Sequence, residues 1–257
     1  MFCYEIPQFE KKRLLRTEML EQLRDYPRDY LEILYSDYSD GILCGCTPGW
    51  VQDKLTIKPG ILRYKEKLYF LKEPFSMTCV AQDKVLYLKV QFHAPVSENG
   101  IMTGKTRIYL DEIPPASADE MELCRFRLQE GARLRDSYEN FADCLTEFDT
   151  IHLIDVLWAS PEKATLHPKI LRQYAMEILR NDNRDAVDAS FAVEILSNRG
   201  ILPEEAVRAY INIQTGSSAG KGNKGLYDGL AKILKNGGMD RSVQKKADGT
   251  MRRVMLL

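Results

Sequence analysis

A glycine-rich stretch from Gly216 to Gly225 comes nearest in composition to a nucleotide-binding site. A phosphate-binding loop needs four residues between its first two glycines, then Gly-Lys-Ser/Thr, and it joins a buried strand to a helix. Here Gly216 and Gly220 enclose three residues, Gly222 stands where the hydroxyl residue belongs, and a helix is expected before the loop. We therefore interpret the stretch as a flexible linker and expect no cofactor.

Cys44 and Cys46, separated by one glycine, could supply two thiolates to a metal ion. A structural zinc site needs two further ligands at a recognisable spacing. The three histidines, His93, His152 and His167, are isolated in the sequence and provide no such pair. We expect both cysteines to be small core residues on the inward face of a strand, and we predict no metal site.

Four acidic residues recur at helical spacing in the middle of the chain. They are Asp136, Glu139, Asp143 and Glu147. Paired carboxylates on one helical face could hold a metal ion or act as general acid and base. Because Arg133 and Arg135 are adjacent, we interpret this face as solvated and salt-bridged. No Ser/His/Asp or Cys/His grouping is present in the pattern, so we predict no catalytic residue and no enzyme activity.

Charge is distributed unevenly along the 257 residues. The whole chain carries −1, but residues 216–257 contain nine Lys and Arg against three Asp, a net +6 that leaves −7 for residues 1–215. This basic region could contact nucleic acid, although it lacks the aromatic residues of single-strand binders. It could equally dock on an acidic neighbouring subunit. Its candidate interface residues are Lys221, Lys224, Arg252 and Arg253.

The composition, 44% hydrophobic and 28% charged, is that of a soluble globular protein. No apolar run has the length of a membrane span, and the first residues lack a secretory signal pattern. We expect a protein of the bacterial cytoplasm that makes no membrane contact, with its six cysteines reduced.

Strand signals dominate residues 41–130, where we predict an antiparallel β-sandwich-like domain. From Lys54 to Pro74 apolar residues alternate with Lys and Arg, which predicts three short antiparallel strands. Strand-like runs occupy residues 42–46, 55–57, 61–64, 68–71, 77–80, 85–92, 106–110 and 123–128. Residues 97–100 and 113–117 are expected to be loops.

Helical signals flank this domain, so the predicted fold class is α+β. Residues 1–40 should form short N-terminal helices, with Thr17 as an N-cap and an interruption at Pro27. Residues 131–215 are read as mixed, then helical, with helices beginning at Pro168, near Asp185 and at Pro203. Residues 216–257 should hold the flexible linker, a short helix near 226–234 and a basic tail.

Four stretches of the sequence resemble a known group of proteins. LLRTEMLEQLRDYPRDYLEILYSDYSDGILCGC, followed by LTIKPGILRYKEKLYFL, resembles proteins encoded in the tail and baseplate clusters of clostridial prophages and phage-tail-like particles. EFDTIHLIDVLWASPEKATLHPKILRQYAMEIL and DAVDASFAVEIL are similar to the same group. The resemblance extends over residues 13–215.

The resemblance implies a structural subunit of a contractile phage tail or phage-tail-like bacteriocin (tailocin), in the baseplate or where tail fibres attach. Its expected partners are other baseplate or tail subunits and a tail fibre or receptor-binding protein, in a homo- or hetero-oligomer. It would leave the cytoplasm as part of the assembled particle. Because interface hot spots are rich in Tyr, four tyrosines become interface candidates, with packing on the sandwich as their alternative role. They are Tyr26, Tyr30, Tyr35 and Tyr38.

Overall fold

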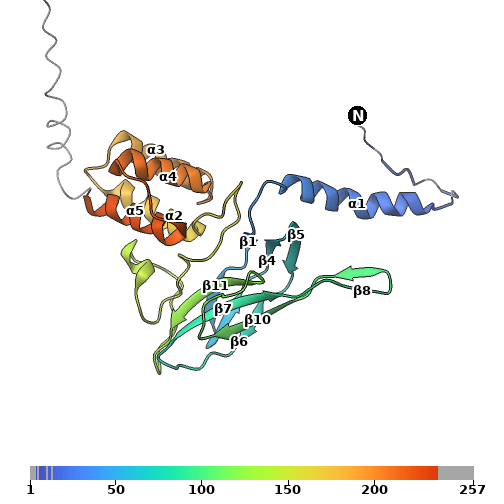
Figure 1. Cartoon of the computed structure of the whole chain (residues 1–257), viewed down its shortest axis with the longest axis horizontal. Coiled ribbons are helices and arrows are strands. Elements are labelled where there is room, and N and C mark those ends of the chain that lie inside the picture. The colour runs from blue at the N-terminus through green and yellow to red at the C-terminus, as the bar shows by residue number, and fades with distance from the viewer. Residues whose placement is uncertain (1–3, 5, 10, 13, 237–257) are drawn as a thin grey trace, which may run out of the picture.

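A projecting helix, a set of antiparallel sheets and a C-terminal helical bundle follow one another along the chain (Figure 1). The computed structural model describes residue 4, residues 6–9, 11–12 and 14–236. The predicted α+β class is confirmed. No helix in this described part of the chain is long and apolar enough to cross a membrane.

The N-terminal helix α1 spans Thr17–Leu34 without a break, although Pro27 lies inside it. The expected division into two short helices is therefore wrong. A proline inside a helix removes one donor, here leaving the Leu23 carbonyl without its usual intrahelical bond, and on an exposed helix water can supply the missing partner. Arg16, not Thr17, is the N-cap residue, and it makes no side-chain capping bond.

Three small antiparallel sheets and one hairpin form the β part. Their strands run β1-β4-β5, β2-β3-β6 and β10-β7-β11, with β8-β9 as the separate hairpin. The first sheet contains β1 (Gly41–Gly45), β4 (Gly60–Tyr64) and β5 (Lys67–Leu71), and the second contains β2 (Pro48–Val51), β3 (Lys54–Ile57) and β6 (Phe75–Met77). The third contains β7 (Val85–Phe92), β10 (Thr106–Asp111) and β11 (Glu120–Arg127), and the hairpin is β8 (Val96–Glu98) with β9 (Ile101–Thr103).

The three strands predicted between residues 54 and 74 form, but they do not share one sheet. β4 and β5 pair through a two-residue turn at Lys65 and Glu66, both with positive φ, as a type I′ turn requires. β3 pairs instead with β2 and β6. The chain crosses from one sheet to the other where Gly45 and Gly60 face each other, and a Cβ on Gly45 would lie 2.1 Å from the Pro59 carbonyl oxygen.

The core of the β part follows the alternation of the sequence. β7 directs Leu88 and Val90 into the interior, where they belong to the same buried core as Leu123 and Phe126 of β11. Lys89 points to the opposite face of the same strand, yet only 2% of its surface is exposed. A buried ammonium group needs charged partners.

Two carboxylates supply those partners. The Lys89 Nζ atom lies 2.8 Å from Asp111 and 3.3 Å from Glu120. Burial alone lowers the pKa of Lys89, but these hydrogen bonds outweigh it and raise the pKa above its ordinary value. Lys89 therefore remains charged and joins β7 to its two neighbouring strands.

Residues 131–166 connect the sheets to the helices without regular structure, apart from the 3₁₀ turn η1 (Ala142–Leu145). The helical face considered for residues 136–148 does not form. The 150–158 segment makes only isolated bridges, such as Ile42 with Trp158 and Arg125 with His152. It is nevertheless buried, since Ile151 and Val156 have no exposed surface.

The C-terminal bundle contains α2 (Pro168–Arg180), α3 (Ala186–Ser197), α4 (Glu204–Thr215) and α5 (Gly222–Asn236). Asp185 caps α3 in a reciprocal capping box with Asp188. Asp188 also accepts a 2.7 Å hydrogen bond from the Tyr210 hydroxyl, which lies 2.6 Å from the Tyr174 hydroxyl. These buried hydroxyls tie α2, α3 and α4 together.

The glycine-rich stretch is partly helical. α5 begins at Gly222, so residues 222–225, expected in a linker, form its first turn. A Cβ on Gly225 would lie 2.2 Å from the Gly220 carbonyl carbon, so these two backbones touch. The glycines here permit a close crossing between the connection and the helix, which composition alone does not distinguish from a linker.

Candidate assembly surface

The helix α1 projects from the rest of the molecule (Figure 1) and contains no buried residue. An apolar series along it repeats at spacings of four, three, four and three residues. The series is Met19, Leu23, Tyr26, Tyr30 and Ile33. This period is typical of helices that pack against another helix. Because 67% of Tyr26 and 59% of Tyr30 are exposed, the apolar side of α1 is open to a partner.

Ion pairs occupy much of the remaining surface of α1. Arg24 lies 2.7 Å from Asp25, and Arg28 lies 3.0 Å from the same carboxylate. Near the end of the helix, Glu32 accepts a 2.9 Å hydrogen bond from Lys67 of β5. That contact holds the C-terminal half of α1 beside the first sheet.

The β8–β9 hairpin is a second projecting element (Figure 1). Its two-residue turn consists of Asn99 and Gly100, both with positive φ. Val96, Ile101 and Met102 are exposed, and Met102 keeps 75% of its surface free. The hairpin thus offers apolar side chains that make no contribution to the core.

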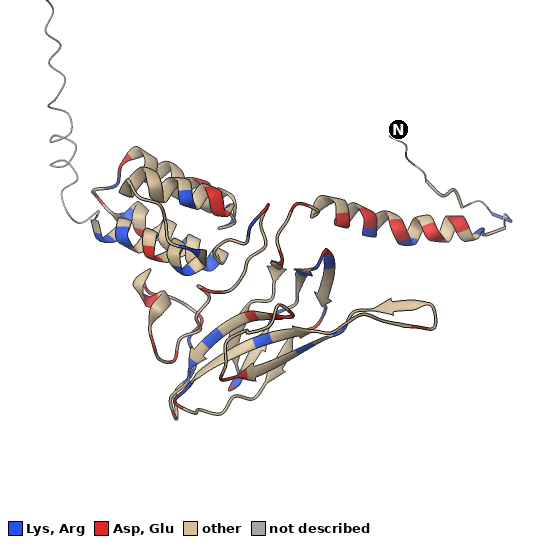
Figure 2. Cartoon of the chain, in the orientation of Figure 1, with Lys and Arg blue, Asp and Glu red and all other residues tan. Residues whose placement is uncertain are grey.

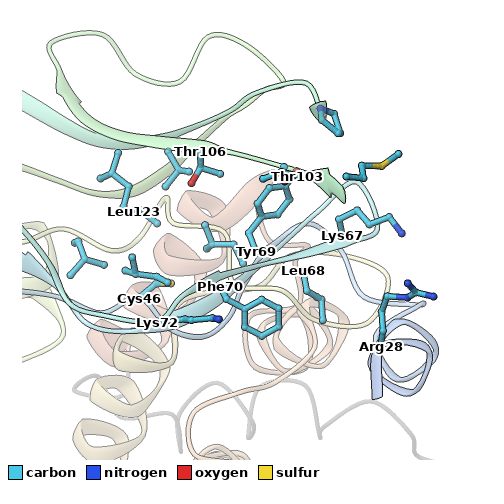
Figure 3. A pocket seen from close by; sticks show the side chains of 18 of the residues that line it. Arg28, Cys46, Lys67, Leu68, Tyr69, Phe70, Lys72, Thr103, Thr106 and Leu123 are labelled. Atoms are coloured by element: carbon cyan, nitrogen blue, oxygen red, sulfur yellow. The ribbon is translucent and has the colours of Figure 1, made fainter. Parts of the chain in front are cut away.

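A groove of about 1010 Å³ lies between these elements (Figure 3). Its lining comes from α1 (Arg28 and Glu32), from residues 67–72, from residues 95, 102–104, 106 and 108, and from the core residues beneath them. Both β5 and β10 are edge strands of their sheets. Phe70, 54% exposed, stands at the β5 side of the groove. The arrangement suits an extended or helical apolar segment of another protein.

Three aromatic side chains, Tyr64, Tyr69 and Phe92, pack together beside the groove. The rings of Tyr64 and Phe92 stack with centroids 3.9 Å apart, and Tyr69 meets Phe92 edge-on at 5.1 Å. Tyr69 lines the groove, and a Cβ on Gly104 would approach its ring to 2.9 Å. Burial, together with a hydrogen bond to Asp119, raises the pKa of Tyr64, so its hydroxyl remains protonated. The cluster presents surface for packing and no ionised group.

The tyrosines predicted from sequence fall into two pairs. Tyr26 and Tyr30 lie exposed on α1. Tyr35 and Tyr38 follow the helix, are half-buried, and contact each other edge-on with centroids 5.1 Å apart. The first pair shares its helix with the groove residues, and the second pair does not line the groove.

The basic candidates lie elsewhere. Lys221 is exposed just before α5, and Lys224 in the first turn of α5 pairs with Asp228 at 2.5 Å. Arg252 and Arg253 lie outside the described residues. The structure therefore does not bring Lys221 or Lys224 to the groove.

Sequence reasoning missed Phe70 and Met102. The Asn99-Gly100 pair was a usable signal, because Asn-Gly between short apolar runs is a strong indicator of a two-residue hairpin turn. Residues 97–100 were instead expected to be a loop, which the pairing of Glu98 with Ile101 corrects. No sequence pattern predicts the exposure of Phe70, because it depends on β5 being the edge strand of its sheet.

The two neighbouring cysteines do not share a face. Positive φ values at Gly45 (66°) and Cys46 (48°) turn the chain, so Cys44 is exposed while Cys46 is buried. The expectation of two inward-facing thiols is therefore wrong. Burial raises the pKa of Cys46 to about 12, which keeps it a thiol. Within the described residues, no group of three or more His, Cys, Asp or Glu side chains could hold a metal ion.

The acidic series at residues 136–147 does not line a helix, because this region is irregular. Asp143 receives two hydrogen bonds from the Arg135 guanidinium, at 2.5 and 2.6 Å. These bonds lower the pKa of Asp143 to about 2. Such a carboxylate is a permanently ionised structural partner, unsuited to proton transfer near neutral pH.

No protein-family model matches the chain, and no curated protein matches it. Among solved structures, a crystal structure of TssK is similar over 91% of this chain and 72% of its own length, with 9% sequence identity and a TM-score of 0.40. A TM-score this low does not indicate a shared fold, so the likeness identifies neither a family nor an activity.

Proposed function

We propose that this chain is a structural subunit of a contractile phage tail or phage-tail-like bacteriocin, located in the baseplate or where tail fibres attach. It acts by assembly with other tail subunits and a fibre or receptor-binding protein, and not by catalysis. It is folded in the bacterial cytoplasm and then carried in the particle. The resemblance of residues 13–215 to prophage tail proteins motivates this proposal.

The observation that carries the assembly role is the exposed apolar surface around the groove. α1, β5 and the β8–β9 hairpin each present large apolar side chains that the fold does not cover. Extended apolar surface of this kind, lined by aromatic residues and bordered by Arg28 and Lys67, has the composition of a protein interface. A tail subunit needs such surface because it is incorporated by contact with its neighbours.

A complementation experiment tests this role. The gene is deleted from the bacterium that makes the particles, and copies encoding the wild type, Phe70→Asp or Met102→Asp are returned. Val51→Asp is the matched control, because Val51 is a strand residue with 55% exposure that does not line the groove. Circular dichroism of the purified variants confirms that each one is folded.

We expect particles without the gene to lack fibres or to fail at the baseplate. Wild type and Val51→Asp should restore them, while Phe70→Asp and Met102→Asp should remain soluble and absent from purified particles. Complete, fibre-bearing particles in the deletion strain would refute the baseplate role. Normal incorporation of both groove variants would show that the groove is not the contact surface.

A further inference from the structure

The apolar stripe of α1 has an acidic border along one side. Helical residues spaced by seven, four and three positions lie on one edge of a helix. Glu18, Asp25, Asp29 and Glu32 have this spacing. Residues Thr17–Leu34 contain five carboxylates and two arginines, so α1 carries a net charge of −3 (Figure 2). Within the described residues, Glu18 forms no ion pair, so part of this edge is free for a cationic partner.

The chain itself contains a segment of complementary chemistry. Residues 237–257, beyond the described part, carry five Lys and Arg against two Asp, a net charge of +3. The same segment is rich in apolar residues that match an apolar stripe. They are Met239, Val243, Met251, Val254, Met255, Leu256 and Leu257. A basic, apolar segment is the kind of partner that an acidic-edged apolar helix binds.

The positions of the two elements favour contact between different copies. α5, whose end at Asn236 precedes the basic segment, lies on the opposite side of the molecule from α1 (Figure 1). To reach α1 of its own chain, the segment would have to pass the bundle and the sheets that lie between the two helices in Figure 1. A neighbouring copy can offer its segment to α1 without this crossing.

We infer that residues 237–257 of one copy dock on the apolar, acidic-edged face of α1 of the next copy. Such a contact is heterologous, because it joins two different surfaces, and it produces rings or open chains of subunits. The inference does not depend on the baseplate proposal, since the partner is a second copy and purified protein is sufficient for the test.

Charge reversal in the full-length chain tests the contact. One variant carries Glu18→Lys and Asp29→Lys on the acidic edge, and another carries Lys245→Glu and Lys246→Glu. The single changes Asp29→Lys and Glu21→Lys are a matched pair, because both carboxylates are exposed and Glu21 lies farther around the helix from the apolar series than Asp29 does. Sedimentation velocity over a concentration series measures association, and circular dichroism confirms that α1 remains helical.

We expect wild-type protein to associate with a salt-sensitive affinity. Each double variant alone should associate roughly tenfold more weakly. Mixing the two double variants should restore association, because each offers the other an oppositely charged contact. Asp29→Lys should weaken association more than Glu21→Lys does.

Three results would overturn the inference. If the Lys245→Glu, Lys246→Glu variant associates like wild type, α1 pairs with another α1 or with a different surface. If wild type remains monomeric at every concentration, no contact between copies exists, and the segment binds its own chain or none. If mixing the double variants restores nothing, the charges act separately and do not meet. If the charge-reversed variants self-associate like wild type while the Phe70→Asp and Met102→Asp variants are absent from particles, this inference is wrong and the baseplate proposal stands.

Discussion

The side-chain amide of Asn223 donates a hydrogen bond to the Val156 carbonyl oxygen over 2.8 Å. The same nitrogen lies 3.2 Å from the Thr165 carbonyl oxygen, so one amide joins the first turn of α5 to both sides of the 156–165 segment. All three residues belong to the buried junction between the helical bundle and the connection from the sheets. A glycine-rich start of α5 thus becomes a fixed attachment point.

Replacing Asn223 with alanine should therefore destabilise the protein. The buried Val156 carbonyl loses this donor, which costs about 1–3 kcal/mol of unfolding free energy. Urea denaturation followed by circular dichroism measures the change. Asn212→Ala is the control, because Asn212 is an exposed residue of α4 and should change stability by less than ~0.5 kcal/mol. Equal effects of the two substitutions would mean that the Asn223 contact has no energetic role.

A second prediction concerns His167, the N-cap residue of α2. Its Nδ1 atom accepts a 3.1 Å hydrogen bond from the Lys169 backbone amide, so that nitrogen carries no proton in the folded state. Burial lowers the pKa of His167 to about 3. Since the unfolded chain binds the proton more readily, this contribution to stability is present above pH ~6.5 and is lost as the pH falls toward 3.

Because the unfolded chain takes up a proton at His167 and the folded chain does not, the free energy of unfolding should fall by ~1.4 kcal/mol for each pH unit below ~6.5. At pH 4.5 the loss should be ~2.7 kcal/mol. His167→Asn removes the titration but keeps a side-chain oxygen that can cap α2. Unfolding free energies measured at pH 7, 5.5 and 4.5 should fall more steeply for wild type than for the variant. Parallel curves would place the pKa of His167 near its ordinary value.

Local patterns were sufficient where a segment has one dominant signal. Alternation over residues 85–92 predicted β7, and Asp185 before an apolar helical run predicted α3, because backbone geometry alone determines which side chains share a face. Pro168 and Pro203 marked the beginnings of α2 and α4, because the fixed φ and missing N–H of proline suit the start of a helix.

Sequence patterns did not predict features that depend on contacts between residues far apart in the sequence. Nothing in the spacing around Asp143 shows that Arg135 will bind it in an irregular loop, since that contact depends on how the loop packs. The partners of β3 likewise depend on a crossing at Gly45 and Gly60 that involves separate strands. The groove at Phe70 lies between two sheets and a helix, so no single segment encodes it.

The glycines of α5 provide a third prediction. Gly225→Ala places a Cβ 2.2 Å from the backbone of Gly220, where nothing can move without shifting the chain. Gly229→Ala, in the same helix, meets the Ile211 side chain at 2.9 Å, and an alanine there also gains up to ~1 kcal/mol of helix propensity.

We therefore expect Gly225→Ala to lose roughly 1–3 kcal/mol of stability and Gly229→Ala to lose less. Thermal and urea denaturation of the two variants give the comparison directly. If Gly225→Ala equals or exceeds wild type in stability, the stretch before α5 is a loose linker, as its composition alone indicates.

A last prediction separates the stability of α1 from that of the body. Pro27 occupies the middle of α1, where a proline costs a helix ~3 kcal/mol relative to alanine. Because α1 buries no residue, this cost falls on the helix itself and is not shared with the core. Pro27→Ala should slow amide hydrogen exchange across residues 17–34 by up to about a hundredfold. The unfolding free energy of the whole protein should change by less than ~0.5 kcal/mol.

Pro203→Ala is the control, since a proline at a helix start carries no such cost and its removal should leave exchange in α4 unchanged. A large rise in global stability with Pro27→Ala would show that α1 is energetically part of the body, and its apolar side would then not be free for a partner.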